Sequence, residues 1–277
     1  MKTLYTILLL CCILGCTQLT PKTFTVEVIN RYTPIKDQGR NQICWAYAML
    51  STIETEHLMR GDSVHLSPAY ITYMLKYEKK APKSNRGMGS TLLNMIQKYG
   101  IVQYDDYPKL DTVIPHTIKF LEEEYTPLEF ANIVCPADDY IALTTTNKYP
   151  YGQWIELETP DNWEHNQFLN VHTDTLLYHT EQAIRRGHGV CWEGDTSEYG
   201  FSFSKGVAQL SLLNGSTTDD HAMAIIGIAH SENGEKYFIM KNSWGTNNPY
   251  NGLMYMSFDY FRQKTIAIYM THTGWDN

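Results

Sequence analysis

The stretch that decides the fold of this chain is DQGRNQICWAY, residues 37–47. Its first part is polar and contains a glycine, which is typical of a loop, and an apolar run follows from Cys44. Apolar residues continue at helical spacing to Leu58, and Gly61 is a suitable residue to end the helix. The sequence therefore predicts a buried helix that has Cys44 at its N-terminus.

A cysteine at the start of a helix is favoured as a thiolate. The helix dipole is positive there, and the first backbone N–H groups have no partner within the helix. A thiolate is a much stronger nucleophile than a thiol. A free cysteine is often only a small buried hydrophobic residue, but that role would not require the preceding polar loop. We therefore take Cys44 as a candidate nucleophile.

Two segments far downstream offer partners for this nucleophile: DDHAM, residues 219–223, and KNSWG, residues 241–245. An apolar strand starts at His221, turns at an Asn-Gly pair, and returns to end just before Asn242. This hairpin brings both side chains to the same end of a sheet. Alone, they would be interpreted as a core histidine and a turn asparagine. With Cys44, they indicate nucleophilic catalysis.

In these segments the chain resembles the papain-like cysteine peptidases. The resemblance implies that Cys44, His221 and Asn242 are the catalytic residues and that Gln38 helps to form the oxyanion hole. It also implies that Trp244 shields the hydrogen bond between the histidine and the asparagine from water. The expected reaction is thiol-dependent hydrolysis of a peptide bond.

The chain departs from the family at the substrate groove, where papain-type enzymes carry a Gly-Gly pair and this chain reads RGMG, residues 86–89. Gly87 and Met88 are therefore the candidate substrate-binding residues, and the arginine that precedes them puts the family's usual subsite preference in doubt. Asp220 either adds negative charge beside the histidine or is a turn residue. The sequence leaves both roles open.

Within the family, the chain is most similar to the branch of bleomycin hydrolase and the bacterial aminopeptidase C. The pointers are the Met in HAM and the segments TPLEF, residues 126–130, and AIRRGHGVCWEGD, residues 183–195. The expected fold class is α+β. One lobe is helical, the other is a bent antiparallel sheet, and the active site lies in the cleft between them. An aminopeptidase-like activity is the leading expectation.

The remaining elements can be placed only coarsely. We expect helices that begin at Ser67-Pro68 and at Ser90, the second of which ends at Gly100, and a further helix over 118–125. Strands are expected within 142–158, around a turn at 149–152. Residues 111–180 contain the insertion that makes the separation of Cys44 and His221 longer than the ~130–150 residues of papain.

Residues 1–16 form an expected lipoprotein-type signal peptide. Lys2 precedes a short apolar stretch that ends in ILGC, residues 13–16, which is similar to a bacterial lipobox. Cys16 would then carry the lipid, and residues 17–277 would be the peptidase domain. This interpretation implies a protein of the bacterial cell envelope, lipid-anchored and facing the periplasm or the outside. Ordinary cleavage near Gly15, which would release a secreted protein, is the alternative.

Composition restricts the partners of the chain. The 277 residues carry a formal net charge of −8 and contain no basic stripe, which argues against nucleic acid. We expect a peptide or protein substrate, and contact with a membrane only through the anchor. No cysteine or histidine cluster has zinc spacing, so neither a metal nor a cofactor is expected. Cys135 and Cys191 are either paired or free, and the oligomeric state stays open.

Two other functions are compatible with the sequence. One is a non-catalytic, peptide-binding pseudo-peptidase on the same scaffold. The other keeps the thiol chemistry but changes the acceptor or the substrate, as a cysteine acyl transferase or a cell-wall amidase. The sequence also leaves open whether a peptidase would act as an exopeptidase or an endopeptidase.

Overall fold

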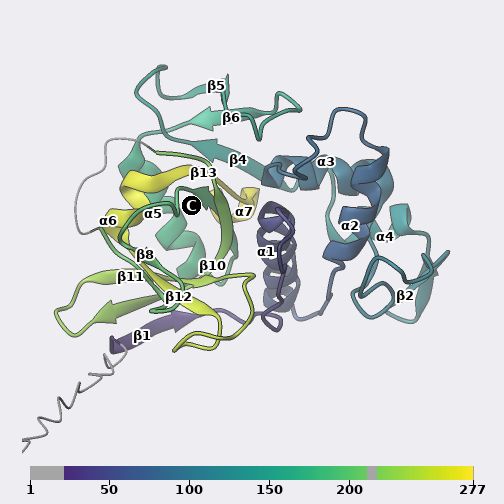
Figure 1. Ribbon diagram of the computed structural model, residues 1–277, viewed down its shortest axis with the longest axis horizontal. Coiled ribbons are helices and arrows are strands. Elements are labelled where there is room, and N and C mark those ends of the chain that lie inside the picture. Colours follow the sequence, from purple (N-terminus) through teal and green to yellow (C-terminus); the bar gives the residue numbers. More distant parts are fainter. Residues whose placement is uncertain (1–21, 211–216, 277) are drawn as a thin grey trace, which may run out of the picture.

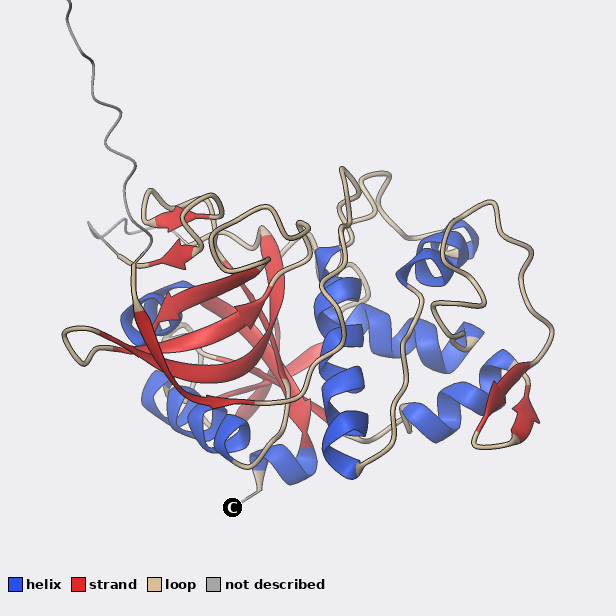
Figure 2. Ribbon diagram, turned by 90° about the horizontal axis from the view of Figure 1, so that it is seen from below, coloured by secondary structure: helices blue, strands red, loops and turns tan. Residues whose placement is uncertain are grey.

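The computed structural model describes residues 22–210 and 217–276 (Figure 1). Helix α1 (Cys44–Arg60) stands between a helical lobe and a lobe built on a large sheet. The view from below shows the same arrangement, with the large sheet and the helices packed on it on one side of α1, and further helices and a small two-stranded sheet on the opposite side (Figure 2). The fold class is α+β, as the sequence predicts.

The helical lobe is built from short helices with defined starts. Ser67 caps one of them by accepting a hydrogen bond from the Tyr70 amide, and Thr126 and Glu129 form a capping box on another. The elements are α2 (Pro68–Met74), a 3-10 turn η1 (Leu75–Tyr77), α3 (Gly89–Tyr99), β2 (Ile118–Phe120), β3 (Glu123–Tyr125) and α4 (Pro127–Val134).

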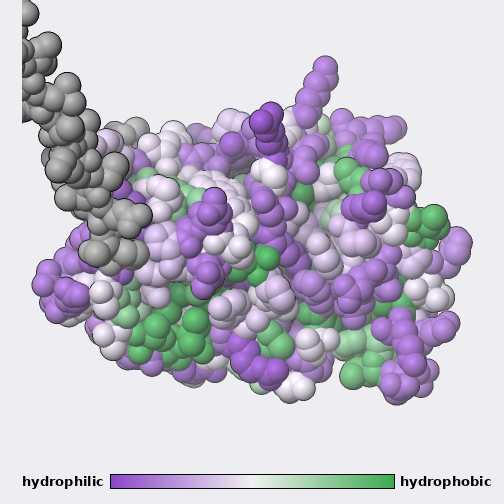
Figure 3. Space-filling model, turned by 60° about the horizontal axis from the view of Figure 1, so that its bottom comes forward, coloured by the Kyte–Doolittle hydropathy of each residue, from purple (hydrophilic) through white to green (hydrophobic). Residues whose placement is uncertain are grey.

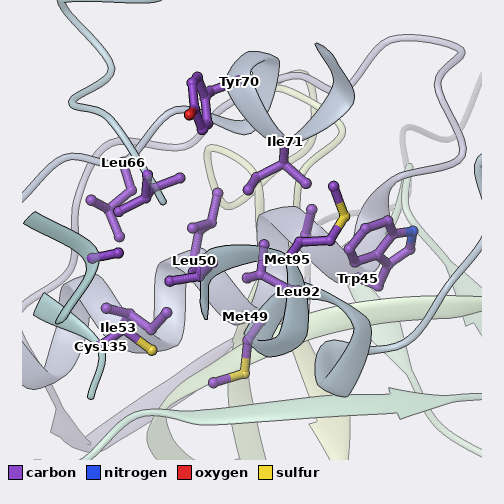
Figure 4. Close-up of a cluster of buried hydrophobic side chains, with 14 of the residues drawn as sticks. Trp45, Met49, Leu50, Ile53, Leu66, Tyr70, Ile71, Leu92, Met95 and Cys135 are labelled. Atoms are coloured by element: carbon purple, nitrogen blue, oxygen red, sulfur yellow. The ribbon is translucent and has the colours of Figure 1, made fainter. Parts of the chain in front are cut away.

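The core of this lobe forms around α1 (Figure 4). Trp45, Met49, Leu50 and Ile53 are each at most 1% exposed. They pack against side chains of the other helices and of the segments between them: Leu66, Tyr70, Ile71, Leu92, Met95 and Cys135. Because α1 also contacts β10 (His221–Ser231) and β7 (Val190–Gly194) of the sheet, it is buried on nearly all sides.

The sheet lobe contains 11 strands in the described part of the chain. Most neighbours are antiparallel, but β4 with β6 and β9 with β12 are parallel, so the sheet is mixed rather than purely antiparallel. The strands are β1 (Phe24–Ile29), β4 (Tyr140–Thr144), β5 (Gln153–Glu156), β6 (Gln167–Asn170), β7 (Val190–Gly194), β8 (Phe201–Ser202), β9 (Val207–Ala208), β10 (His221–Ser231), β11 (Lys236–Lys241), β12 (Leu253–Ser257) and β13 (Thr265–Thr271).

Three helices belong to this lobe: α5 (Thr173–Arg185), α6 (Phe258–Lys264) and α7 (His272–Trp275). They pack against the sheet and against one another, and together they bury a second apolar core. On the face shown in Figure 3, hydrophobic residues form separate patches among hydrophilic ones. No helix among the described residues is long and apolar enough to cross a bilayer.

The long strand β10 organises the sheet. Its first half pairs with β7, with His221 opposite Gly194, and its second half pairs with β1 on the same side. On the other side it pairs with β11, with Ala224 opposite Lys241. At Gly227 the backbone of β1 passes so close to β10 that a Cβ atom would sit 2.6 Å from the carbonyl oxygen of Val28.

The predicted helices that start at Cys44, at Ser67-Pro68 and near Ser90 are confirmed, as is the hairpin after His221. The helix predicted over 118–125 is wrong, because β2 and β3 form a hairpin there. Its turn residues, Leu121 and Glu122, have φ angles of 48° and 70°. Tertiary packing of Ile118 and Phe120 into the core overrides the local helix preference of the segment.

The cysteines that the structure describes are all free: Cys44 is half-buried, whereas Cys135 and Cys191 are buried. Of the two states that the sequence left open for Cys135 and Cys191, these residues adopt the unpaired one. Cys16 lies outside the described residues, so the structure says nothing about the predicted anchor.

A buried ionic cluster joins α1 to both lobes. Glu54 is fully buried and accepts hydrogen bonds from the Leu66 amide at 2.8 Å, from Lys36 Nζ at 2.7 Å and from the Thr33 hydroxyl. Lys241, at the end of β11, places its Nζ 3.6 Å from the same carboxylate. Burial alone raises the pKa of Glu54, but the two lysines outweigh it and hold the pKa below its usual value.

We expect the substitution Glu54→Ala to destabilise the protein by about 3–5 kcal/mol, because it leaves two buried ammonium groups without their counter-charge. Urea unfolding measures this change as a lower midpoint. Asp111→Ala is the matched control, since Asp111 is 80% exposed and pairs only loosely with Lys109. Equal midpoints for the two variants would contradict a stabilising role for the cluster.

Candidate active site

A cavity of about 150 Å³ opens between the two lobes at the N-terminus of α1. Both lobes contribute to its lining, so its shape depends on how they are held together. The residues that line it are Gln38, Gln42, Cys44, Trp45, Arg86, Gly87, Asp161, Glu193, Asp219, Asp220, His221, Ala222 and Trp244.

Cys44 is the first residue of α1, and no side chain caps the helix at Ile43. The first amides of the helix therefore remain available to the sulfur and to a ligand. Burial raises the pKa of the Cys44 thiol to about 12, and hydrogen bonds from the backbone of Ala222 and Trp45 act in the opposite direction. A thiolate at this position requires a further positive charge beside it.

His221 and Asn242 meet at the end of the β10–β11 hairpin. Nε2 of His221 lies 2.8 Å from Oδ1 of Asn242. The amide oxygen can only accept, so Nε2 carries a proton and donates, which leaves Nδ1 able to take a proton. The Ser243 amide donates to the same oxygen at 2.7 Å and fixes its orientation. Burial lowers the pKa of His221 to about 4.

Trp244 covers this histidine. The two ring centroids are 4.3 Å apart, with an angle of 32° between the planes. Phe201 and Phe203 in turn meet the indole edge-on, at centroid distances of 5.9 Å and 5.5 Å. His221 and Asn242 are 4% and 2% exposed, and a hydrogen bond in such a buried setting is stronger than one in water.

Gln38 is held by contacts across the two lobes. Its Oε1 accepts from the Ser243 hydroxyl at 2.6 Å, and its backbone amide donates to the Ser243 carbonyl at 2.8 Å. Its Nε2 donates one hydrogen to the Asn41 carbonyl at 2.7 Å. A side-chain amide has two N–H groups, so one remains for an oxyanion in the cavity.

The structure divides the other candidate residues. Gly87 lines the cavity, whereas Met88 is fully buried in the core of the helical lobe, and its side chain is not among those lining the cavity. The carboxylate of Asp220 accepts hydrogen bonds from the Thr196 amide and hydroxyl and from the Ser197 amide. These contacts are typical of a turn residue. Of the two roles that the sequence left open for Asp220, this is the one that does not require it to act on the histidine.

Three acidic residues of the cavity escaped the sequence analysis as site residues. Glu193 lies on β7 opposite Ala222, is 2% exposed, and accepts from the Gly89 amide at 2.6 Å. Asp219 immediately precedes Asp220, and Asp161 comes from the loop between β5 and β6. In the sequence, the signal that could have revealed Glu193 is the presence of a glutamate within an otherwise apolar strand. Among residues 22–210 and 217–276, no group of three or more His, Cys, Asp or Glu side chains is arranged to hold a metal ion.

Arg86 bridges the lobes at one side of the cavity. Its Nε lies 2.9 Å from both carboxylate oxygens of Asp161, and its guanidinium also donates to the backbone carbonyl of Asp219. The Trp163 indole donates to the Arg86 carbonyl at 3.0 Å. A second cavity of about 660 Å³ shares Arg86, Asp161 and Asp219 with the first. The Arg86–Asp161 pair therefore stands between the two.

The sequence is similar to those of known proteins. The family described as "Papain family cysteine protease" matches residues 20–272. A viral cathepsin of Spodoptera litura multicapsid nucleopolyhedrovirus is 25% identical over 88% of this chain and 57% of its own length. Aminopeptidase G of Lactobacillus delbrueckii subsp. lactis is 26% identical over 53% of this chain and 39% of its own. The chain thus spans only about half the length of these relatives.

Solved structures agree on the fold. PepW from Lactobacillus rhamnosis HN001 superposes with a TM-score of 0.73 at 16% identity, over 91% of this chain and 83% of its own. Bromelain from Ananas comosus gives 0.53 at 18% identity, over 87% and 94%. The name of aminopeptidase G agrees with the predicted aminopeptidase branch. From the family match and from the geometry of its cleft, the chain belongs to the papain family of cysteine proteases.

Proposed function

We propose that the protein hydrolyses peptide bonds through Cys44, His221 and Asn242. His221 takes the thiol proton, and the sulfur attacks the carbonyl carbon of the substrate. His221 then gives that proton to the leaving amine, which departs as the acyl-enzyme forms. Water attacks the acyl-enzyme with His221 as the base, the acid is released, and the thiol is restored.

The developing oxyanion is stabilised by the free N–H of Gln38 and by the backbone N–H of Cys44. Preorganised donors of this kind are worth about 3 kcal/mol each, because they do not reorganise as charge develops. Asn242 holds the imidazole in the tautomer that accepts the thiol proton. Charges on sulfur and imidazole also stabilise each other, which offsets the burial that opposes each of them alone.

The observation that carries this proposal is that Asn242 orients His221 through a 2.8 Å contact, while His221 and Cys44 line the same cavity. A non-catalytic peptide binder would not need an oriented imidazole beside a thiol at a helix N-terminus. A cysteine acyl transferase or a cell-wall amidase would use the same groups, and the choice of substrates in the test below separates those functions.

Two features support an aminopeptidase-like activity. The cavity beside Cys44 holds only a small group, and the Arg86–Asp161 pair closes one side of it. Residues 272–276 do not supply this closure, because Trp275 stacks on His179 of α5 and the Gly274 carbonyl accepts from Arg186. In this chain the length of the bound substrate is limited by the bridge between the lobes.

We also propose that Cys16 is lipidated and that the domain acts outside the cytoplasm, at the bacterial cell envelope. Support comes from the order of the first residues: a positive start, an apolar stretch, and ILGC at residues 13–16. The membrane would then be contacted through the anchor, and the substrate would be a peptide or protein.

We expect Cys44→Ala to fold normally and to lose hydrolysis of fluorogenic peptides altogether, because no nucleophile remains. The peptides come in pairs that differ only in a free or acetylated N-terminus, and cleavage confined to the free form supports the aminopeptidase. Cys135→Ala, which removes a buried thiol distant in sequence, is the control. Undiminished turnover by Cys44→Ala would refute the mechanism, and cleavage of muropeptides alone would favour the amidase.

The reactivity of Cys44 should depend on the protonation of His221. Burial lowers the pKa of this histidine, so the imidazole is neutral above about pH 4 and can accept the thiol proton there. We expect the rate of alkylation of Cys44 by iodoacetamide to rise as the pH increases through about 4 and then to level off.

In His221→Ala, Cys44 remains buried, but the imidazole that accepts its thiol proton is gone. The rate at pH 6 should fall by about tenfold or more and recover only at alkaline pH, because burial raises the pKa of the thiol. Mass spectrometry of the peptide that contains Cys44 gives the rates. Identical pH profiles for the variant and the unaltered protein would show that the two side chains do not interact.

Cys16→Ser should release the protein from the membrane fraction of a bacterial host, because the Cys16 thiol is the lipid acceptor in ILGC. Metabolic labelling with a palmitate analogue and fractionation measure the change. Cys11→Ser, which alters a thiol within the apolar stretch that precedes ILGC, is the matched control and should keep both the label and the membrane association. An unaltered chain that carries no label and is found outside the membrane fraction would favour ordinary secretion.

A further inference from the structure

The cavity beside Cys44 contains two carboxyl groups that lack a counter-charge. Glu193 is 2% exposed, and its hydrogen-bond donors are neutral: the Gly89 amide at 2.6 Å and the Tyr269 hydroxyl at 3.0 Å. Oδ2 of Asp219 is buried and has no hydrogen-bond partner. Neither carboxylate forms an ion pair with a residue in the described part of the chain. Buried polar atoms of this kind are normally satisfied.

The one cation that lines the cavity, among the residues that the structure describes, is already engaged. Arg86 binds both oxygens of Asp161, and toward Asp219 it reaches the backbone carbonyl rather than the carboxylate. Arg86 and Asp161 therefore balance each other. No cation among the described residues forms an ion pair with Glu193 or Asp219. Burial together with repulsion from neighbouring carboxylates therefore raises the pKa of each, that of Asp219 to about 7, although the charge of Arg86 acts in the opposite direction on Asp219. A cation placed between the two groups would favour their charged forms and remove this penalty.

We propose that Glu193 and Asp219 form an anionic subsite that binds a cationic group of the substrate next to the bond attacked by Cys44. The group is an ammonium or a guanidinium, and it comes either from the N-terminus of the peptide or from a lysine or arginine side chain. The volume of about 150 Å³ suits one such group, because an engineered cavity of that size holds a single benzene.

This inference rests on the proposed peptidase activity, because a substrate subsite has a role only if the protein cleaves a substrate. Its first test does not require that activity. Glu193 also has a structural contact, since its carboxylate accepts from the amide of Gly89 at the start of α3. Glu193→Gln keeps an oxygen for that hydrogen bond and removes the charge. Its NH2 group can donate to the Tyr269 hydroxyl, which is able to accept as well as to donate. The substitution therefore separates electrostatic binding from support of the helix. Asp219→Asn does the same at the second carboxylate.

The first experiment measures how charge affects access to Cys44, and it does not require catalysis. Cys44 reacts with 2-aminoethyl methanethiosulfonate, a cation, or with propyl methanethiosulfonate, its neutral equivalent in size. In each case the sulfur forms a mixed disulfide and methanesulfinate leaves. The ratio of the two rates is followed by mass spectrometry of the peptide that contains Cys44.

We expect the unaltered protein to favour the cation, and Glu193→Gln and Asp219→Asn each to lower that preference by about threefold or more. Glu122→Gln, which removes a carboxylate that is 92% exposed in the helical lobe, should leave the ratio unchanged. If either variant fails to fold, the other still decides the result. Ratios that are the same in both variants and in the unaltered protein would overturn the proposal.

The second experiment identifies the source of the cation. Four fluorogenic peptides combine a free or an acetylated N-terminus with an arginine or a citrulline. A loss of kcat/KM in Glu193→Gln that is confined to the free N-terminus assigns the subsite to the α-ammonium. A loss confined to arginine assigns it to the side chain. An equal loss with the acetylated citrulline peptide would show a merely structural role and overturn the proposal.

The two experiments also distinguish failure of the subsite from failure of the proposed function. If the unaltered protein cleaves none of the four peptides but keeps a cation preference that depends on Glu193, the subsite stands and the peptidase activity does not. If it cleaves peptides without any dependence on their charge or on Glu193, the activity stands and the subsite is wrong.

Discussion

Burial of α1 between the two lobes is the constraint on which the rest of the structure depends. Its side chains fill the core of the helical lobe, and its other face lies against β10 and β7. A helix enclosed in this way cannot shift without opening both interfaces, so its position is set by the packing of apolar groups along its whole length. Only the N-terminus reaches the cavity, and Cys44 is the residue found there. The placement of the thiol is thus a consequence of the core.

Polar contacts then fix the angle between the lobes. Ser243 binds both the backbone and the side chain of Gln38, so the loop before α1 and the loop after β11 move together. Glu54 of α1 accepts a hydrogen bond from Lys36, which lies in the segment before the helix. The same carboxylate lies near Lys241 at the end of β11. These contacts act at the edges of a rigid packed interface. They determine which small rotations the cleft permits, and catalytic geometry is sensitive to shifts of about 1 Å.

Local sequence was enough to predict the hairpin that carries His221 and Asn242, because strand, turn and strand are contiguous. It failed at residues 118–125, where burial in the core rather than local preference decides the conformation. It also failed for the acidic cavity, because nothing near Glu193 in the sequence reveals that Asp219 shares its surroundings. The sequence indicated candidate groups for the chemistry, whereas the electrostatic character of the cavity required distant segments to meet in the assembled fold.

Strand β1 has a consequence for how the N-terminus can be processed. Residues 24–29 pair with the second half of β10, and Asn30 donates from its side chain to the carbonyls of Ile184 and His188. The segment that follows the predicted leader is therefore an integral part of the sheet. Removing it would expose the backbone of a central strand and invite aggregation. Any proteolytic trimming would have to stop before Phe24 for the folded domain to remain intact.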